Sequence, residues 1–570
     1  MAQPLSAVLA DVSVLDRAAI ERSGASGVAD LLARLPGIEF ARNGGPGTST
    51  SVFLRGGETR HTAVYIDGVR IDSQSTGGAA WEQIPLDQIE RIEVLRGPAA
   101  AVYGSDAVAG VVQLFTRRGG QSTRVGAALG VGSWQTRTAQ VNASGGLGEF
   151  DYALSASHGR SDGFNARVAA TANPDDDGWR RQAAQARVGW QLSSQHRLDA
   201  TALSSRLRAQ YDGSLANDDV SSHTLDSGSL AWSGRWSEAS NSRVQLGQSR
   251  NTYETRPSFY RTESTLRNLL LQHELHVAEG QRVAATLERR EDRLHNPATS
   301  AAARDLDGRR LQDALALAWL GDFGAQALQV HARHDRDSEF GGKSTGSLAW
   351  GWRFTPQWRF SAAAATSFRA PTLYQRFSEY GVASLVPESG RNVELGLRWS
   401  AGGSELGAAL WRNRVDQLIA FGAAGACASS FGCYANVARA RYEGVTLAGR
   451  HDWGGVALRG SIDWHDPRNL DTDKLLARRA QRLATFGVET SLAGWTLGVE
   501  AQAAGARFDD AANTRRLGGY GLVNLVAGRM LMPGLSLEGR IDNLGDKAYE
   551  LARTYATPGR NAQLTLRWTL

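Results

Sequence analysis

Apolar and polar positions alternate along most of the chain, from residue 121 to the C-terminus. The alternation is regular in segments 150–157, 392–399, 535–542 and 563–570, where every second residue is apolar or small. Successive side chains of a β-strand point to opposite faces of the sheet. The pattern therefore predicts many strands, each with one apolar and one polar face.

Three features of this pattern favour one closed barrel in a membrane over soluble β-sandwiches, which alternation alone leaves open. The segments are about ten residues long, the length of a tilted transmembrane strand. Trp, Tyr and Phe often stand at segment ends, as in interfacial girdles, and the polar face is rich in Arg, Asp, Glu and Gln, as a wet lumen requires. Only closure of the sheet pairs every backbone group in lipid. At roughly 20 residues per strand and loop, residues 121–570 predict a transmembrane β-barrel of about 22 antiparallel strands.

Residues 11–118 have the pattern of a compact α/β segment. VSVLDRAAIERSG predicts a strand followed by a helix, and SGVADLLARLPGIEF carries an apolar helical stripe that stops at Pro36 and Gly37. SVFLRGG, TAVYIDGVRI and IERIEVLRGP predict short strands punctuated by Gly and Pro. We therefore divide the chain into an N-terminal α/β domain, residues 1–120, and a barrel domain, residues 121–570.

Composition and charge exclude several classes of protein. No run approaches the roughly 18 to 20 consecutive apolar residues of a membrane-spanning helix. Lys plus Arg (63) nearly balances Asp plus Glu (58) and no basic block is present, so nucleic acid is not an expected partner. The histidines are scattered, and no GxSxG, HExxH or phosphate-loop pattern occurs in a suitable context, so we do not expect an enzyme.

The two cysteines, Cys427 and Cys433, lie close together in CASSFGC, among small residues typical of an exposed loop. Two neighbouring thiols in such a loop predict a small disulfide and hence an oxidising compartment. Two unrelated buried thiols are the alternative. A metal site is not expected here, because no His or further Cys lies nearby at ligand spacing.

The chain opens with Met1 and AQPLSAVLADVSVL, which lacks the basic start and apolar core of a secretory signal. This leaves either a cytosolic protein or a mature, trimmed chain. The membrane-barrel pattern of the remaining sequence favours the second.

Several longer motifs occur in one order and spacing. They are LLARLPGIEF, SVFLRGGETRHTAVYIDGVRI and IPLDQIERIEVLRGPAAAVYGSDAVAGVVQLFT in the first domain and RIDNLGDKAYELARTYATPGRNAQLTLRWTL at the C-terminus. FRAPTLYQRF and VPESGRNVELG match strand motifs of the same barrels. In these motifs the chain resembles the TonB-dependent outer-membrane receptors, most closely the cobalamin receptors, which its short barrel, plug sequence and acidic loops also suggest.

The resemblance implies a monomeric importer in the lipid of the outer membrane. The first domain would be a plug inside the barrel lumen, and TonB would be the periplasmic partner. Cobalamin or a related corrinoid is the cargo that the resemblance implies. A ferric siderophore, haem or another metal chelate carried by the same machine is one alternative, and a passive pore or surface-binding protein is another.

Plug residues are expected to have a structural role by the same resemblance. Two arginines would lie among lumen-facing carboxylates of the barrel and hold the plug in place, with solvated surface charge as the alternative. Glycines of the motifs are expected where the backbone needs positive φ or a close approach. The residues assigned this role are Arg55, Gly56, Asp67, Gly68, Arg96 and Gly97.

The outward loops of the plug, 43–49 and 73–81, would form the floor of the ligand site. Their small residues offer backbone groups and hydroxyls, which suit the side amides of a corrinoid better than a charged clamp would. Barrel aromatics would add a wall, unless two of them, Phe259 and Tyr260, belong to the membrane girdle. The candidate substrate-binding residues are Asn43, Gly44, Gly45, Ser73, Ser75, Thr76, Gly77, Trp81, Tyr211, Phe259 and Tyr260.

Two external loops, NPDDDGW and QYDGSLANDD, carry clusters of aspartate. Acidic loops that face each other repel unless a cation lies between them, and calcium prefers several carboxylate oxygens. The resemblance implies a calcium site with ligands Asp175, Asp177, Asp212 and Asp219, and Asn165 as a weaker ligand. Solvated acidic loops are the alternative, because no EF-hand spacing is present.

The short box through which the family pairs with TonB is not visible, because the chain begins just after the place where that box should lie. Ligand binding, rather than transport, is therefore the expectation for the sequence as it stands. Leu570 also departs from the family pattern, since outer-membrane barrels commonly end in Phe.

Overall fold

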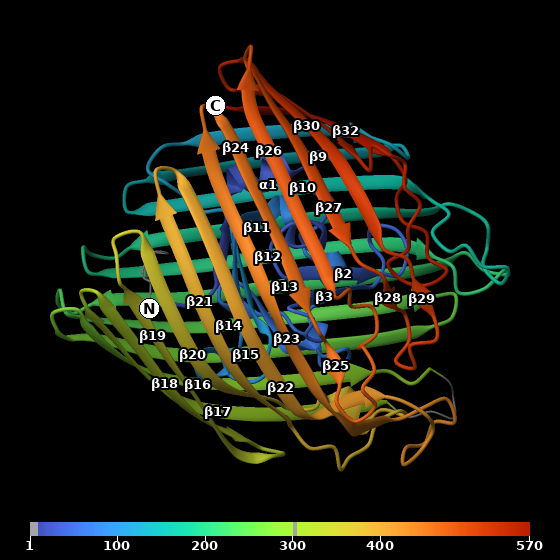
Figure 1. Cartoon of the computed structure of the whole chain (residues 1–570), viewed down its shortest axis with the longest axis horizontal. Coiled ribbons are helices and arrows are strands. Elements are labelled where there is room, and N and C mark those ends of the chain that lie inside the picture. The colour runs from blue at the N-terminus through green and yellow to red at the C-terminus, as the bar shows by residue number, and fades with distance from the viewer. Residues whose placement is uncertain (1–8, 300–304) are drawn as a thin grey trace.

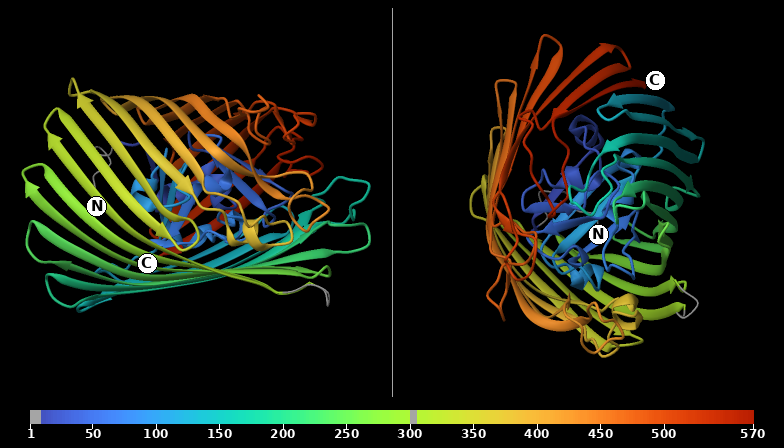
Figure 2. Two further views of the ribbon diagram at one scale, coloured as in Figure 1. Left: turned by 90° about the horizontal axis from the view of Figure 1, so that it is seen from below. Right: turned by 90° about the vertical axis from the view of Figure 1, so that its right-hand side faces the viewer.

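The computed structural model describes residues 9–299 and 305–570, which form a barrel of long strands around an N-terminal domain (Figure 1). Figure 2 shows this domain, in blue, enclosed by the ring of strands. We call the two parts the plug and the barrel. The last plug strand ends at Thr116 and the first barrel strand begins at Arg124, and the predicted boundary at residue 120 falls between them.

The plug elements are β1 Val12–Leu15, α1 Arg17–Ser23, α2 Val28–Leu32, β2 Ile38–Arg42, β3 Thr50–Leu54, η2 Thr59–His61, β4 Thr62–Ile66, β5 Val69–Arg70, η3 Trp81–Gln83, η4 Leu86–Gln88, β6 Ile89–Arg96, α3 Ala100–Tyr103 and β7 Gly110–Thr116. Five strands form a mixed sheet in the order β1-β6-β7-β4-β5, in which β4 and β7 are parallel. β2 and β3 form a separate hairpin. The α/β segment predicted from the sequence is thus a small domain with its own sheet.

Local sequence explains the two helices of the plug. Asp16 caps α1, accepting a hydrogen bond from Ala19 N (2.8 Å), and Gly24 ends the helix in the left-handed conformation. α2 stops at Leu32, earlier than the apolar stripe predicted, and Leu35 packs at the margin of the core. None of the helices in the described residues is long and apolar enough to span a membrane.

The barrel elements are β8 Arg124–Gly132, β9 Thr136–Leu147, β10 Phe150–Phe164, β11 Asp177–Gln191, β12 His196–Tyr211, β13 Asp219–Arg235, β14 Ser240–Arg256, β15 Tyr260–Ala278, β16 Gln281–Asn296, β17 Leu306–Phe323, β18 Gln326–Asp337, β19 Gly341–Arg353, β20 Trp358–Arg369, α4 Leu373–Phe377, β21 Glu388–Ala401, β22 Ser404–Phe421, β23 Tyr434–Trp453, β24 Val456–His465, β25 Arg468–Asn469, β26 Arg482–Leu492, β27 Trp495–Ala504, β28 Arg507–Phe508, β29 Arg516–Leu517, β30 Tyr520–Met532, β31 Leu535–Asp542 and β32 Asn561–Thr569. Neighbouring strands are antiparallel, and the sheet closes where β32 pairs with β8. Over the described residues this is a closed barrel of 22 strands, with the two-residue β25 as an additional short pairing. The predicted plugged barrel is confirmed.

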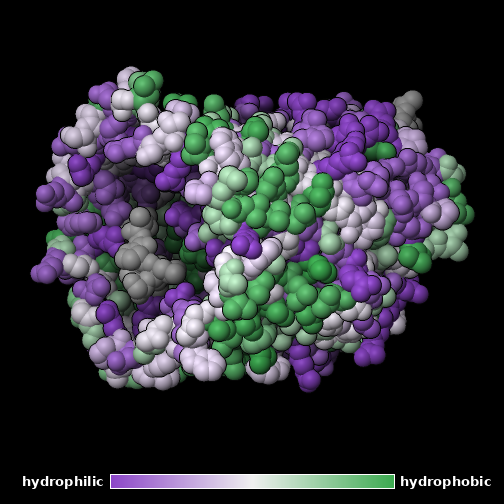
Figure 3. Space-filling view, turned by 90° about the horizontal axis from the view of Figure 1, so that it is seen from above, coloured by the Kyte–Doolittle hydropathy of each residue, from purple (hydrophilic) through white to green (hydrophobic). Residues whose placement is uncertain are grey.

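Alternate residues of the barrel strands face outward and are apolar around the middle of the barrel. In β21 the outward residues Val393 and Leu395 are 56% and 47% exposed, whereas the neighbouring Asn392, which faces the lumen, is buried. Figure 3 shows apolar residues gathered over the middle of one face, with polar surface toward both ends. An apolar band between polar ends is the surface that a barrel presents to lipid, as the alternation predicted.

The two ends of the barrel differ in their connections. Short turns such as 148–149 and 454–455 join strands at one end, and long loops such as 165–176 and 422–433 join them at the other. Outer-membrane barrels have short periplasmic turns and longer external loops. The short turns therefore mark the periplasmic end, and Leu9 of the described N-terminal segment lies there, against Gly351 near the end of β19.

Aromatic side chains line the outer surface near the short turns. Trp350, Trp352, Phe354, Trp358 and Trp399 form a chain of neighbouring rings with centroids 5.5–6.4 Å apart. Such a girdle suits the membrane interface, because these rings are largely apolar and carry a polar edge.

Several strands are longer than the predicted ten residues, and β15 and β23 contain 19 and 20 residues. The additional residues lie at the loop end, where the backbone ladder continues beyond the apolar band and both faces become polar. A hydropathy pattern detects only the part of a strand that meets lipid, so the predicted strands were too short.

FRAPTLYQRF is not a strand throughout, which corrects the strand interpretation of that motif. β20 ends at Arg369, and Pro371 follows, which cannot donate to the strand ladder. The next residues form α4, where Thr372 and Gln375 make a capping box. This helix lies on the lumen side of the external end, beside the plug loop 73–81.

Candidate ligand-binding site

The first outward plug loop, residues 43–49, packs closely against the barrel wall. A Cβ on Gly44 would stand 3.0 Å from Ala166 Cβ, and one on Gly47 would stand 3.0 Å from Ala209 Cβ. Gly44 and Gly47 also have positive φ values of 112° and 100°. The glycines therefore let the loop reach the wall, and this explains them without any ligand.

Polar groups of the same loop lie nearer the external side. Asn43 Oδ1 accepts a hydrogen bond from Arg478 Nη1 (3.0 Å), which ties the plug to the external loop between β25 and β26. Gly45 O accepts from Thr48 Oγ1 (2.8 Å), and Ser49 is exposed. The loop thus offers an exposed hydroxyl on a braced turn.

The second plug loop, residues 73–81, is held by barrel hydroxyls. Ser73 Oγ lies 3.2 Å from Ser264 Oγ, and Ser75 O accepts a hydrogen bond from Thr372 Oγ1 (3.4 Å). Thr76 is exposed at the tip of the loop, between buried neighbours. Its hydroxyl is therefore free to meet a ligand from outside.

Gly77 and Trp81 are both buried. A Cβ on Gly77 would stand 2.5 Å from Arg369 Nη2, so a side chain there would strike the barrel. Trp81 is 1% exposed in the plug core, and its Nε1 donates to Thr59 Oγ1 (3.1 Å). The structure therefore corrects the placement of Trp81 on the ligand floor: burial of a large apolar ring fixed it inside.

Three aromatic candidates lie at the external ends of strands. Tyr211 ends β12 and is half-buried, and Tyr260 begins β15 with its ring centroid 6.1 Å from that of Tyr253. Phe259 lies in the turn before Tyr260, with the guanidinium of Arg256 4.6 Å from its ring centre. None of these three is in the aromatic girdle, which lies near the short turns.

Four further aromatics that the sequence analysis did not single out gather near this end. Tyr374 of α4 lies 6.4 Å from both Tyr380 and Tyr434, and Phe421 lies 5.3 Å from Tyr434 and 5.7 Å from Tyr380. We call these four residues the aromatic wall. They come from α4, the following loop and two strand ends, so no local pattern connects them.

A disulfide joins Cys427 and Cys433 in the loop that links the two strands of the aromatic wall. Gly422 N donates to Cys433 O (3.0 Å), and Tyr434 N donates to Tyr380 O (2.9 Å). The covalent link thus closes the loop directly before Tyr434 and restrains the position of that ring.

The two acidic loops lie side by side at the external end. Asp177 Oδ2 accepts a hydrogen bond from Ala166 N (3.0 Å), and Asp219 Oδ2 accepts one from Gly213 N (2.8 Å). Each of these carboxylates thus folds its own loop and retains one oxygen for another partner.

Two oxygens of the predicted calcium set are buried without a hydrogen-bond partner, namely Asn165 Oδ1 and Asp212 Oδ2. The guanidinium of Arg167 already brings one positive charge to these loops, because its Nη1 donates to the backbone oxygens of Asp212 and Gly213. Unpartnered buried oxygens are costly, and a hard cation would satisfy them.

Burial and repulsion between neighbouring aspartates raise the pKa values of two carboxyl groups in these loops. Burial, followed by the charges of Asp175 and Asp218, raises the pKa of Asp212 to about 6. Burial, followed by the charges of Asp212 and Asp175, raises the pKa of Asp177 to about 7. Among the described residues, however, no three His, Cys, Asp or Glu side chains are close enough to hold a metal ion together. The donors thus fit calcium chemically, although their carboxylates are not gathered around one point.

Ion pairs anchor the plug at its periplasmic side. Arg55 donates to Glu394 Oε2 of the barrel (2.6 Å) and to Asp11 Oδ2 of the plug (2.9 Å). Arg96 instead bonds within the plug, to Pro36 O (2.8 Å) and Asp11 Oδ1 (3.3 Å). Of the two arginines expected to face barrel carboxylates, only Arg55 bonds one directly.

The other plug residues with a predicted structural role lie in turns. Gly56, Gly68 and Gly97 have φ values of 75°, 81° and 88°. Asp67 Oδ1 accepts a hydrogen bond from Thr116 N (3.1 Å), which ties the β4–β5 turn to the end of β7. These positions hold the plug in shape, and Gly56 also meets the external loop between β25 and β26, because its O accepts a hydrogen bond from Arg479 Nε (3.2 Å).

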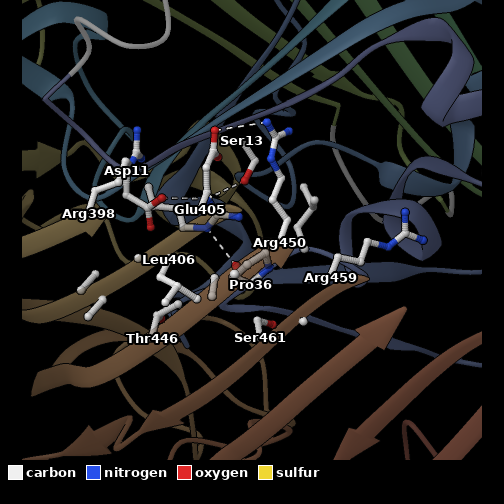
Figure 4. A pocket seen from close by; sticks show the side chains of 18 of the residues that line it. Asp11, Ser13, Pro36, Arg398, Glu405, Leu406, Thr446, Arg450, Arg459 and Ser461 are labelled. Atoms are coloured by element: carbon white, nitrogen blue, oxygen red, sulfur yellow. Dashed lines mark hydrogen bonds and ion pairs between the residues drawn. The ribbon is translucent and has the colours of Figure 1, made fainter. Parts of the chain in front are cut away.

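A cavity of about 340 Å³ lies on the opposite side of the plug, beside the N-terminal segment 9–13 (Figure 4). Asp11 and Ser13 from the plug and Arg398 and Arg450 from the barrel line it. It gives periplasmic solvent access to β1 and is separate from the candidate ligand site.

A plug held inside a closed 22-strand barrel, with braced loops at the external end, defines a gated outer-membrane transporter. Residues 4–111 match the TonB-dependent Receptor Plug Domain, and residues 111–544 match the β-barrel of TonB dependent receptor-like proteins. The chain therefore belongs to the TonB-dependent receptors, an outer-membrane family of receptors and transporters, not enzymes, whose members bind a ligand and interact with TonB.

Among characterised relatives, the chain is 30% identical over 578 aligned positions to the vitamin B12 transporter BtuB of Photobacterium profundum, covering 99% of this chain and 93% of that protein. The solved structure of a ferric enterobactin receptor (PfeA) variant from Pseudomonas aeruginosa with enterobactin is similar, with a TM-score of 0.85, 20% identity, and coverage of 98% and 99% of the two chains. The iron transporter FrpB from Neisseria meningitidis has a TM-score of 0.84 at 15% identity, over 98% and 99% of the chains. These structural likenesses establish the fold.

Proposed function

We propose that this receptor binds cobalamin or a related corrinoid and imports it into the periplasm. The observation that carries this proposal is the 30% identity, across nearly the whole of both chains, to a vitamin B12 transporter. The exposed hydroxyls of Ser49 and Thr76, on loops braced by the barrel, support it. Hydroxyl and backbone groups suit the many amides of a corrinoid, and each good hydrogen bond in a dry site adds specificity.

The aromatic wall supports the same proposal. Tyr374, Tyr380, Phe421 and Tyr434 form one side of the external end, and Tyr211, Tyr253 and Tyr260 stand on strands β12, β14 and β15. A large ring system such as a corrin presents broad faces that aromatic side chains pack against.

Calcium is part of the proposal. Asp175, Asp177, Asp212, Asp219 and Asn165 would hold it, since they supply hard oxygens, two of them buried and unpartnered. Bound calcium would remove the repulsion between the two loops and so order the rim of the ligand site.

Isothermal titration calorimetry tests the proposal. We expect saturable binding of cyanocobalamin that is tighter with calcium than with EGTA. The Asp212→Asn, Asp219→Asn double variant should lose the calcium effect and retain weaker binding. Absence of saturable binding in both conditions would exclude cobalamin as the cargo.

A matched pair of aromatic variants locates the site. Tyr434→Ala should weaken cyanocobalamin binding by about tenfold, because loss of a buried aromatic contact costs about 1–3 kcal/mol. Phe323→Ala removes an aromatic side chain at the short-turn end of β17 and should leave affinity unchanged. Equal effects of the two variants would contradict the placement of the ligand.

A ferric siderophore is the second candidate. Arg478 bonds Asn43 of the floor loop, and Arg167 follows Ala166, which packs against Gly44; both would suit an anionic chelate. Ferric enterobactin in the same calorimeter, and growth rescue by candidate chelates under iron limitation, distinguish the two cargoes.

A further inference from the structure

Outward-facing charges extend across neighbouring barrel strands just beyond the apolar band. Arg267 of β15, Arg289 of β16 and Arg309 of β17 all lie on the loop side of outward leucines. Their side chains are 49%, 60% and 59% exposed. On an outer-membrane barrel this level faces the polar head groups of the outer leaflet.

These arginines have too few acidic partners. A single carboxylate, that of Glu291, pairs with three arginines: Arg267 (3.5 Å), Arg293 (2.8 Å) and Arg309 (2.5 Å). Arg289 has its own partner, Asp313 (2.9 Å). One carboxylate shared by three guanidinium groups leaves a local excess of positive charge. Exposed ion pairs are weak, so these arginines can exchange their carboxylate partner for an anion of higher charge.

The same arginines border a groove of about 560 Å³ on the outer surface of β13 to β17. Leu230, Leu246 and Leu269 line the side toward the middle of the membrane and are 49%, 51% and 43% exposed. Gly228, which has no side chain to fill the space, lies between β12 and β14. The groove is therefore apolar at one end and cationic at the other.

A second outward groove, of about 1120 Å³, continues from the first across β8 to β14 and shares Gly228 and Gln248 with it. Small outward residues, including Ala184, Ala186 and Ala202, line it. Alanines in place of leucines leave room for more than one hydrocarbon chain against the wall.

We propose that this surface is a binding site for a phosphorylated, acylated glycolipid of the outer leaflet. A phosphate group binds the planar forks of Arg267, Arg289 and Arg309, which match its geometry. The acyl chains lie along the leucines and alanines of the grooves, where van der Waals packing holds them. The proposal concerns the lipid-facing wall and does not depend on the cargo.

Native mass spectrometry of the full receptor in detergent tests the proposal. The probes are lipid A with two phosphates, the same lipid without phosphates, and phosphatidylglycerol. The intact receptor should retain the bisphosphorylated lipid in preference to the other two. The triple variant Arg267→Gln, Arg289→Gln, Arg309→Gln should bind it at least about tenfold more weakly, because it loses three charge-assisted contacts to phosphate.

The control removes the same number of charges from the lumen, as Arg398→Gln, Arg450→Gln, Arg459→Gln, all of which line the periplasmic cavity. It should retain the lipid like the intact receptor. The single variant Arg309→Gln should show a partial loss, and heat-modifiable gel migration reports folding of every variant. Undiminished binding by the folded triple variant, equal loss in the control, or equal retention of the phosphate-free lipid would overturn the proposal.

Discussion

At the scale of single residues, the guanidinium of Arg55 joins three parts of the molecule. It is 4% exposed and pairs with Asp11 of the N-terminal segment and Glu394 of the barrel. Removing one member of a buried ion network leaves its partners charged and unpaired, at a cost of about 3–5 kcal/mol. We expect Arg55→Ala to increase hydrogen exchange in residues 12–15 strongly.

The matched control for this prediction is Arg22→Ala, since Arg22 is 50% exposed and lies 3.8 Å from Glu489 of the barrel. An exposed pair of this kind contributes about 0–1 kcal/mol. Exchange that rises equally in both variants would show that Arg55 is not an anchor.

Glu39 of β2 gives the plug a pH dependence. Burial, opposed by Arg507 and the N–H of Ala480, raises the pKa of Glu39 from 4.5 to about 7. A raised pKa means that the folded state binds the proton more tightly, so plug stability falls as pH rises from about 4.5 through about 7. Glu39→Gln should therefore stabilise the plug at pH 8, by at most about 3 kcal/mol, and have little effect at pH 4. Urea denaturation followed by hydrogen exchange in residues 38–42 measures this, and an equal gain at both pH values would contradict it.

At the scale of elements, β1 is the part of the plug best placed to move. It lies at the edge of the sheet and borders the periplasmic cavity, and within residues 9–299 and 305–570 its one pairing is with β6, through four residues. A pull from the periplasm on the chain before β1 would separate these pairs one after another. A disulfide across the directly opposed residues Ser13 and Val94, as Ser13→Cys, Val94→Cys, should therefore preserve cyanocobalamin binding and abolish uptake by cells until a reductant is added.

The control for this staple is Ala41→Cys, Ser51→Cys, which links opposed residues of the β2–β3 hairpin and leaves β1 free. Uptake should continue in the oxidised control. Normal uptake by the oxidised β1 variant would show that this strand need not separate from the sheet.

The elements themselves were largely predictable, because the period of two is local and a strand in lipid must show it. Val393 and Leu395 alternate with Asn392 and Glu394 in the sequence as they do across the wall. The site was less predictable. Arg55 and Glu394 are separated by 339 residues, and no local pattern announces such a pair.

The ligand floor illustrates both outcomes within one loop. Thr76 is exposed as its small, polar surroundings suggested, whereas Trp81 is buried in the plug core. A tryptophan in a sequence is equally compatible with a binding wall and a core, and only packing decides between them. The aromatic wall was missed for a related reason, since its four members come from separate elements.

At the scale of the whole molecule, the plug and the barrel each have their own β-sheet. The barrel closes through β32 and β8, and its sheet contains none of the plug strands that the structure describes. A 22-strand barrel without a plug has a wide lumen. A variant that lacks residues 9–120 should therefore fold as a barrel and conduct ions in planar bilayers, whereas the intact receptor should not. Heat-modifiable migration verifies that the truncated barrel has folded. If the intact receptor conducts freely, the plug does not seal the lumen and passive diffusion becomes the better account. If the folded truncated barrel does not conduct, some other part of the chain seals the lumen.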